Sequence, residues 1–171
     1  PRFGTEEELQ NVISTYEKSG MKIMVDFPLS NVSENHEWFA NGQNHDYIAS
    51  KQNGIITFDL NNADVQSALK ESLKAFVKQY DVSIRLTNIG EASTTFLNEL
   101  IKVVKDERGH AYVISNQSSE ANFDAMYDDE MIETQRNIFK TVDQDTSNIV
   151  RHAATMPPTQ VLIDSPWTDR F

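Results

Sequence analysis

MKIMVDFPLSNVS, residues 21–33, opens with a short and mostly apolar run from Met21 to Phe27. Such a run is typical of a strand that is buried on both faces of a parallel sheet. A helical pattern precedes it, with a capping box of Thr5 and Glu8 at its start and Gly20 at its end. The chain therefore begins with a helix that leads into a buried strand.

The same alternation of strand and helix continues to the end of the chain. Buried strands are predicted, in chain order, at residues 22–27, 82–86, 111–115, 123–127 and 160–164. Helical patterns are predicted to begin near Thr5, Asn62, Ser93, Met131 and Ser147. Strands that are joined by helices of this length pair in parallel. The predicted fold class is therefore α/β, with parallel strands and outer helices.

Periodicity alone leaves two parallel architectures open, a doubly wound open sheet and a closed barrel. Neither G-x-G-x-x-G nor a Walker A sequence follows any predicted strand, which disfavours a nucleotide-binding sheet. Residues 30–58 are polar and irregular, and they are predicted to form one long loop. No internal repeat or linker interrupts the pattern, so the chain is interpreted as a single domain.

Composition excludes several classes of function. The 171 residues carry a formal charge of -11, and the basic residues are scattered, which argues against nucleic acid as a partner. The chain has no cysteine and no apolar segment long enough to span a membrane. It begins at Pro1 without a signal sequence, so we expect it to be a piece of a longer protein. The compartment, cytoplasmic or extracellular, stays open.

Five segments in the same order resemble the α-amylase family of glycoside hydrolases. Residues 26–33 (DFPLSNVS) look like the strand end D-x-x-x-N-H-x-S of that family, and residues 36–39 (HEWF) look like its H-x-W-F continuation. The other three segments are similar to D-L-N-x-x-N-P-x-V, G-F-R-x-D and D-S-H-D-T-x-R-F. They are residues 59–65 (DLNNADV), 83–87 (SIRLT) and 164–171 (DSPWTDRF).

This resemblance implies that residues 1–171 form part of a (β/α)8 TIM barrel, from roughly its third to its seventh strand. The first two strands and the eighth are then expected outside this chain. Residues 30–58 correspond to a reduced version of the subdomain that active amylases insert there. The unpaired edges of such a partial barrel predict either self-association or a missing remainder of the barrel.

The positions that carry catalysis in the family hold other residues here. Thr87 stands at the nucleophile, Asn116 at the general acid and Trp167 at the transition-state stabiliser. The two substrate-binding histidines of the family fall on Asn31 and Pro166.

Four further positions describe what is left of the site. The resemblance leaves a vestigial pocket of Asp26, Asn31, Arg85 and Asp164, in which Asp26 is expected to pair with Arg85 as a structural ion pair. Ser30 replaces the calcium-binding Asn of the family, and the histidines do not have the spacing of metal ligands, so no metal and no cofactor is expected.

The chemistry of the replaced residues agrees with a loss of catalysis. A retaining glycosidase requires two carboxyl groups about 5–5.5 Å apart, one as nucleophile and one as proton donor. Thr87 is a poor nucleophile without a neighbouring base, and Asn116 carries no transferable proton at neutral pH. The predicted function is therefore that of a catalytically inactive α-amylase-like barrel that serves binding or assembly, with a protein or an oligosaccharide as partner.

Two other functions remain open. The first is an active glucan or glucoside hydrolase, or a transglycosidase, in which the motifs are aligned differently and Glu120 is a displaced acid. The second is a carbohydrate-binding domain that holds a glucan without cleaving it. Trp38 could then be a platform for a sugar ring, although an aromatic residue in a half-buried loop is more often a packing residue.

Overall fold

The computed structural model describes residues 4–140, 146–155 and 161–162. It contains a five-stranded sheet in the order β1-β5-β6-β7-β8, in which all neighbouring strands are parallel. The strands are β1 (Met24–Pro28), β5 (Ser83–Thr87), β6 (Val113–Ser115), β7 (Ala125–Tyr127) and β8 (Val161–Leu162). Spatial order follows chain order, as in a (β/α)8 barrel. The predicted parallel sheet is thus confirmed.

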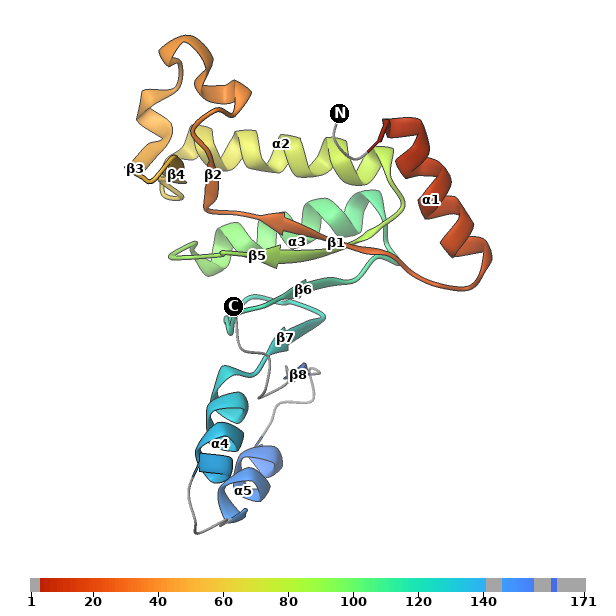
Figure 1. The fold of residues 1–171 in the computed structure, drawn as a ribbon, viewed down its shortest axis with the longest axis vertical. Helices are drawn as coiled ribbons and strands as arrows, with labels where there is room; N and C mark the ends of the chain where they lie inside the picture. The colour runs from red at the N-terminus through yellow and green to blue at the C-terminus, as the bar shows by residue number, and fades with distance from the viewer. Residues whose placement is uncertain (1–3, 141–145, 156–160, 163–171) are drawn as a thin grey trace.

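Five α-helices connect these strands or precede them. They are α1 (Glu6–Lys18), α2 (Ala63–Gln79), α3 (Thr94–Glu107), α4 (Asp129–Lys140) and α5 (Ser147–Thr155). Figure 1 shows α2 and α3 side by side along β1 and β5, and α4 beside α5 at the other end of the sheet. No helix in the described ranges is both long and apolar enough to cross a membrane.

Three of the predicted helix starts, at Thr5, Asn62 and Ser93, are present in the structure, and each has a side-chain cap. Thr5 and Glu8 form the full capping box of α1. The side chain of Asn62 accepts from the backbone of Asp64, and that of Ser93 accepts from the backbone of Phe96. A cap of this kind stabilises a helix by about 1 kcal/mol.

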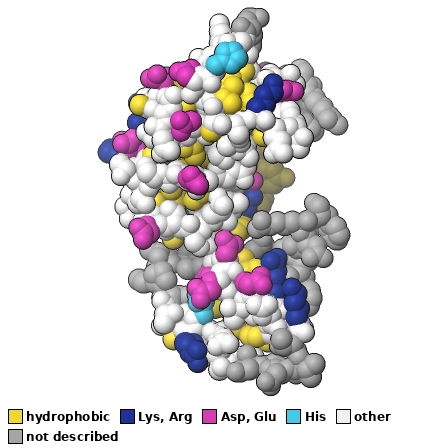
Figure 2. All heavy atoms as spheres, turned by 90° about the vertical axis from the view of Figure 1, so that its left-hand side faces the viewer, with side chains coloured by type: hydrophobic (Ala, Val, Ile, Leu, Met, Phe, Trp, Pro, Cys, Tyr) yellow, Lys and Arg dark blue, Asp and Glu magenta, His cyan; other side chains and the backbone are white. Residues whose placement is uncertain are grey.

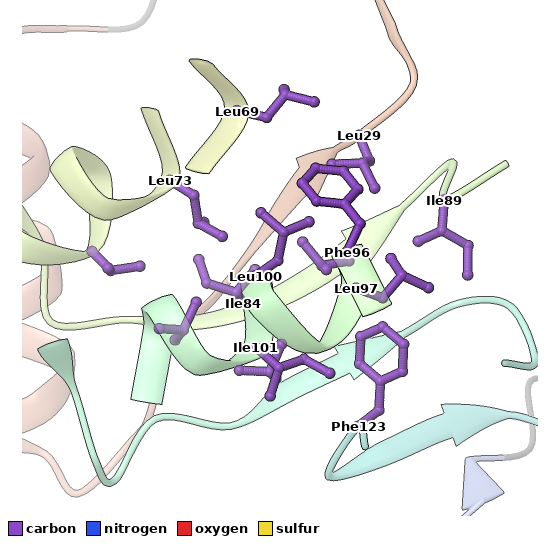
Figure 3. Close-up of a cluster of buried hydrophobic side chains, with 14 of the residues drawn as sticks. Leu29, Leu69, Leu73, Ile84, Ile89, Phe96, Leu97, Leu100, Ile101 and Phe123 are labelled. Atoms are coloured by element: carbon purple, nitrogen blue, oxygen red, sulfur yellow. The ribbon is translucent and has the colours of Figure 1, made fainter. Parts of the chain in front are cut away.

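The hydrophobic core lies between the sheet and the helices α2 and α3 (Figure 3). Leu73 of α2, Leu100 of α3, and Ile84 and Leu86 of β5 are all fully buried. Burying one such side chain contributes about 1.5–3 kcal/mol. The helical spacing of the apolar residues in α2 and α3 explains why one face of each helix turns toward the sheet.

The prediction of one long loop at residues 30–58 is wrong. This insert holds a second, antiparallel sheet in the order β2-β4-β3 and two short 3-10 helices. The elements are β2 (Asn31–Ser33), η1 (Glu37–Gly42), η2 (His45–Tyr47), β3 (Ile48–Gln52) and β4 (Ile55–Phe58). Phe58 is buried in the main hydrophobic core and packs against Trp38 and Phe39, which ties the insert to that core.

A turn signal for this hairpin is present in the sequence. Asn53 and Gly54 join β3 to β4 and have φ angles of 52° and 78°. Two consecutive left-handed residues form the type I′ turn that suits a two-residue hairpin, and Asn-Gly is its preferred sequence. The residues around this dipeptide are mostly polar, as in a loop, and the sequence therefore predicted a loop in place of a hairpin.

We predict that Gly54→Ala lowers the free energy of unfolding by about 1–2 kcal/mol, the cost of a side chain in the left-handed region. An added Cβ at this position meets the Glu34 carboxylate at 3.5 Å, an ordinary contact, so the cost is conformational. Gly109→Ala is the control, since Gly109 has no positive φ and its added Cβ meets only a carbonyl oxygen at 3.8 Å. Urea unfolding of both variants measures the difference. Equal effects would contradict the assignment of the turn.

Candidate functional site

The carboxyl ends of β1, β5, β6 and β7 lie at one edge of the parallel sheet. In α/β folds this edge carries the functional site. Thr87 is the last residue of β5, Asn116 directly follows β6, and Tyr127 is the last residue of β7. The structure therefore places Thr87 and Asn116, two positions that the resemblance assigns to catalysis, at the ends of adjacent strands.

One polar cluster crosses this part of the sheet and is centred on Arg85. The Arg85 Nε and one terminal nitrogen donate to the two carboxylate oxygens of Asp26 at 2.7 and 2.8 Å. The other terminal nitrogen donates to the Tyr127 hydroxyl at 2.7 Å. The predicted pair of Asp26 and Arg85 is thus present, and Tyr127 is a third member that the sequence did not indicate.

The cluster lies on the face of the sheet opposite the helices. Val25, Ile84 and Leu86 face the hydrophobic core, and Asp26 and Arg85 alternate with them. Parallel register pairs Asp26 with Arg85 directly. In a barrel this face is the interior, so the cluster occupies the inside of the barrel wall.

Ionisation of the cluster follows from its hydrogen bonds. The bond from Arg85 lowers the pKa of the Asp26 carboxyl below its usual value, and the same bond raises the pKa of the guanidinium. Both groups are therefore charged over the whole neutral range. Each of the three guanidinium nitrogens of Arg85 thus donates one hydrogen bond, two to Asp26 and one to Tyr127.

Neither strand end offers a carboxylate at the positions the resemblance assigns to catalysis. Thr87 is half-buried, and its hydroxyl makes no hydrogen bond within the described residues. The Oδ1 atom of Asn116 is buried and has no hydrogen-bond partner there. A buried acceptor left unsatisfied costs about 1–3 kcal/mol.

The remaining residues of the predicted pocket are only partly covered by the structure. Asn31 begins β2, is half-buried, and its Oδ1 accepts from the Ser30 hydroxyl at 2.9 Å. Asp164, Pro166 and Trp167 lie outside the described residues.

Two further expectations from the sequence concern Glu120 and a metal. Glu120 is exposed in the connection between β6 and β7, and no ion pair holds it within the described part of the chain. Across the described ranges, no group of three or more acidic, histidine or cysteine side chains is arranged to hold a metal ion. The absence of a bound metal stays a prediction.

A second ionic cluster, which the sequence did not indicate, joins α4 to α5. Asp128 is nearly buried, with 10% of its side chain exposed, and its Oδ1 accepts from the backbone of Met131 at the start of α4. Its Oδ2 lies 2.6 Å from the His152 Nε2, and the His152 Nδ1 lies 3.6 Å from Glu130. The hydrogen bond to Asp128 raises the pKa of His152.

Comparison with known proteins agrees with this geometry. Residues 1–54 match the family model described as "Alpha amylase, catalytic domain". No curated protein matches the sequence. An α-amylase from Lactobacillus plantarum superposes with a TM-score of 0.79 at 15% identity, covering 95% of this chain and 45% of its own. The resemblance to the α-amylase family is thereby confirmed.

Two further solved structures place the fold in the same class. An α-amylase from Geobacillus thermoleovorans complexed with acarbose gives a TM-score of 0.77 at 18% identity, over 93% of this chain and 42% of that one. The cyclic α-maltosyl-(1→6)-maltose hydrolase from Arthrobacter globiformis, in complex with maltose, gives 0.74 at 14% identity, over 92% and 44%. The chain thus has the fold of part of an α-amylase (β/α)8 barrel and spans less than half the length of these structures.

Tyr127→Phe is predicted to lower the free energy of unfolding by about 1–2 kcal/mol, because it removes the acceptor for a charged donor of Arg85. Tyr112→Phe is the matched control, since Tyr112 is 59% exposed and its hydroxyl makes no hydrogen bond with the described residues. That change is expected to stay within about 0.5 kcal/mol. Chemical unfolding measures the free energy of unfolding of both variants. If Tyr127→Phe lowers it no more than Tyr112→Phe does, the hydrogen bond between Arg85 and Tyr127 does not stabilise the fold and the prediction is wrong.

His152 makes the stability of the fold depend on pH. Its pKa is raised in the folded chain, so its bond to Asp128 stabilises the fold fully below the ordinary pKa of about 6.5. This stabilisation is lost as the pH rises through the folded pKa. We expect His152→Gln to destabilise the protein more at about pH 5 than at about pH 9. His45→Gln, at an exposed site in η2, controls for the substitution, and a difference independent of pH would refute the pairing.

Proposed function

We propose that this chain belongs to a catalytically inactive α-amylase-like barrel whose role is binding or assembly. The observation that carries the proposal is the pair of adjacent strand ends at Thr87 and Asn116, which present a hydroxyl and an amide in place of two carboxyl groups. A retaining glycosidase needs carboxyl groups there to form and to hydrolyse its covalent intermediate.

The chemistry of each residue supports the same conclusion. The Thr87 hydroxyl has no base bonded to it in the described chain, so nothing activates it as a nucleophile. The Asn116 amide has no acidic proton to donate to a leaving group. The charge of Arg85 is balanced by Asp26, with which it forms an ion pair. Trp167, in the third replaced position, adds no carboxylate.

The fold does not require these carboxyl groups, because one face of the sheet packs against the hydrophobic core and the strand ends carry the positions assigned to catalysis. The core between β5, α2 and α3 contains neither Thr87 nor Asn116. Residue 87 lies on the inner face. Threonine instead of aspartate at this position therefore leaves the apolar packing of Ile84 and Leu86 in place. An inactive barrel of this kind remains a rigid scaffold.

Binding or assembly is the role that such a scaffold offers. The free edge of β1 and the open inner face expose backbone groups and partly exposed side chains, among them Met24. We propose that these edges are covered either by the remaining strands of the barrel or by self-association. An oligosaccharide held without cleavage is the second candidate, favoured by the neighbouring structures that were solved with acarbose and with maltose.

The full-length protein is predicted to show no hydrolysis of α-1,4- or α-1,6-linked glucans. A missing group in a catalytic unit removes nearly all of the rate, so no partial activity is expected. Purified protein is incubated with maltooligosaccharides and the release of reducing ends is measured, with an active α-amylase in parallel.

Two variants make the result decisive. Glu120→Gln and Asp164→Asn remove the carboxyl groups that a differently aligned active site would use. Turnover in the wild-type protein that disappears in either variant would show a working hydrolase. Background turnover that is equal in all three samples indicates a contaminant and agrees with the proposal.

A further inference from the structure

The turn between β3 and β4 consists of two residues that can react with each other, Asn53 and Gly54. The side-chain amide of an asparagine and the backbone nitrogen of the next residue belong to one short stretch of chain, so their reaction is intramolecular and favoured by proximity. We propose that Asn53 is a modification site, at which this reaction releases ammonia and converts the asparagine to aspartate or isoaspartate. The site is separate from the strand ends and does not depend on the proposed function.

The reaction needs only water as a second reactant. The Gly54 nitrogen attacks the Asn53 Cγ, a bond forms between them, and the bond from Cγ to Nδ2 breaks. The Nδ2 leaves as ammonia with the proton of the Gly54 amide, and a cyclic imide remains. Water then opens the imide at one of its two carbonyl carbons. Opening at the side-chain carbon gives aspartate, and opening at the main-chain carbon gives isoaspartate, whose main chain is one methylene longer.

The attacking nitrogen belongs to the residue that hinders the reaction least. Gly54 has no Cβ beside this nitrogen, and its N–H donates no hydrogen bond to any residue that the structure describes. Gln52 and Ile55, on either side of the turn, pair with each other in the ladder, so the two turn residues lie outside it. The Gly54 carbonyl, in contrast, accepts from the backbone nitrogen of Glu34 at 2.9 Å. The turn is held in place while its reactive nitrogen stays free.

The side chain of Asn53 is free as well. It is exposed, and it makes no hydrogen bond within the part of the chain that the structure describes. Figure 1 shows β3 and β4 at the margin of the molecule, and Figure 2 looks onto that side, where charged side chains are spread among uncharged atoms. Water therefore reaches the Cγ of Asn53, and ammonia can leave into the solvent.

Two other asparagines share the left-handed backbone of Asn53 but not its freedom. The φ angles of Asn44, Asn53 and Asn88 are 52°, 52° and 51°. The Asn44 Nδ2 donates to a backbone oxygen of η1 at 2.8 Å, so the leaving group is held there. Ile89 follows Asn88 and has a branched side chain, and its N–H donates to a glutamine side chain at 3.0 Å. Of these three, only Asn53 has both reacting groups unbonded in the described chain.

Asn62 provides an internal comparison, because trypsin leaves it in the same peptide as Asn53, residues 52–70. The Asn62 Oδ1 accepts from the backbone of Asp64 at 2.8 Å, and its Nδ2 donates to the backbone oxygen of Asp46 at 3.1 Å. Both ends of this amide are therefore bonded, and the residue caps α2. The structure thus predicts that the two asparagines of one peptide react at different rates.

Isoaspartate at position 53 changes the geometry of the hairpin. A two-residue turn sets the pairing of Gln52 with Ile55, and an added methylene makes the connection longer than this turn allows. The Gly54 carbonyl moves with it and loses its bond to the Glu34 N–H at the end of β2. Because β4 is the central strand of the insert, all three strands are affected. Aspartate keeps the original main chain and, like asparagine, adopts the left-handed region.

The test follows the full-length protein in mildly alkaline buffer over days. The tryptic peptide 52–70 is measured by mass spectrometry, with fragment ions that distinguish Asn53 from Asn61 and Asn62. We expect the mass shift of an amide replaced by a carboxyl group at Asn53, with isoaspartate among the products, before any shift at the other two. Asn41, which also precedes a glycine, lies in a different tryptic peptide and is followed separately.

Asn53→Asp is the matched variant, because it removes the amide and carries the charge of the product. Its peptide 52–70 should show no mass shift at this position during the incubation. The aged wild-type protein is separated from the unmodified protein by its additional negative charge. It should unfold at a lower urea concentration than Asn53→Asp does, and this difference reports the isoaspartate.

Wild-type protein that is unfolded in urea during the same incubation is the reference for the rate. If Asn53 stays an amide in the folded protein after it has been converted in the unfolded chain, the turn protects it and the proposal is wrong. A mass shift that appears at Asn62 before Asn53 would also overturn it. If the aged protein unfolds at the same urea concentration as Asn53→Asp, the expected change in the hairpin is refuted. The hydrolysis assay is independent of all these outcomes.

Discussion

The Arg85 guanidinium joins three strands of the sheet through hydrogen bonds to Asp26 on β1 and to Tyr127 on β7, across β6. A buried or half-buried charge requires a partner with good geometry, and here the carboxylate binds both sides of the fork. The positions of the strand ends, and hence of Thr87 and Asn116, depend on this arrangement. The apolar core on the other face packs the helices against the sheet, and the cluster adds side-chain bonds between strands that the backbone ladder already pairs.

Much of the fold could be predicted because its signals are local in sequence. The capping box at Thr5 and Glu8, the cap residues Asn62 and Ser93, and the apolar spacing of α2 and α3 each lie within a few residues. The antiparallel sheet of the insert was missed, since its strands are short, β2 and β3 are largely polar, and the turn between β3 and β4 is marked only by a single Asn-Gly dipeptide. Local composition there outweighed the turn chemistry.

The site was predictable in part and for a similar reason. The partnership of Asp26 and Arg85 follows from a charge on a buried strand that needs an opposite charge nearby. Tyr127 lies 42 positions from its partner Arg85, and His152 lies 24 positions from its partner Asp128. No sequence pattern indicates contacts between residues so far apart. Such contacts arise only once the strands and helices are placed in space.

The inward direction of Arg85 has a consequence for how the sheet is assembled. Side chains alternate along a strand, so a slip of β5 by one residue would turn the guanidinium into the apolar core and bring Ile84 or Leu86 to the inner face. Only one alignment of β1, β5 and β7 satisfies both the core and the three hydrogen bonds of Arg85. The cluster thus disfavours a shifted register of the strands, because the shift would bury the Arg85 charge and break its hydrogen bonds. This effect does not depend on any chemistry at the strand ends.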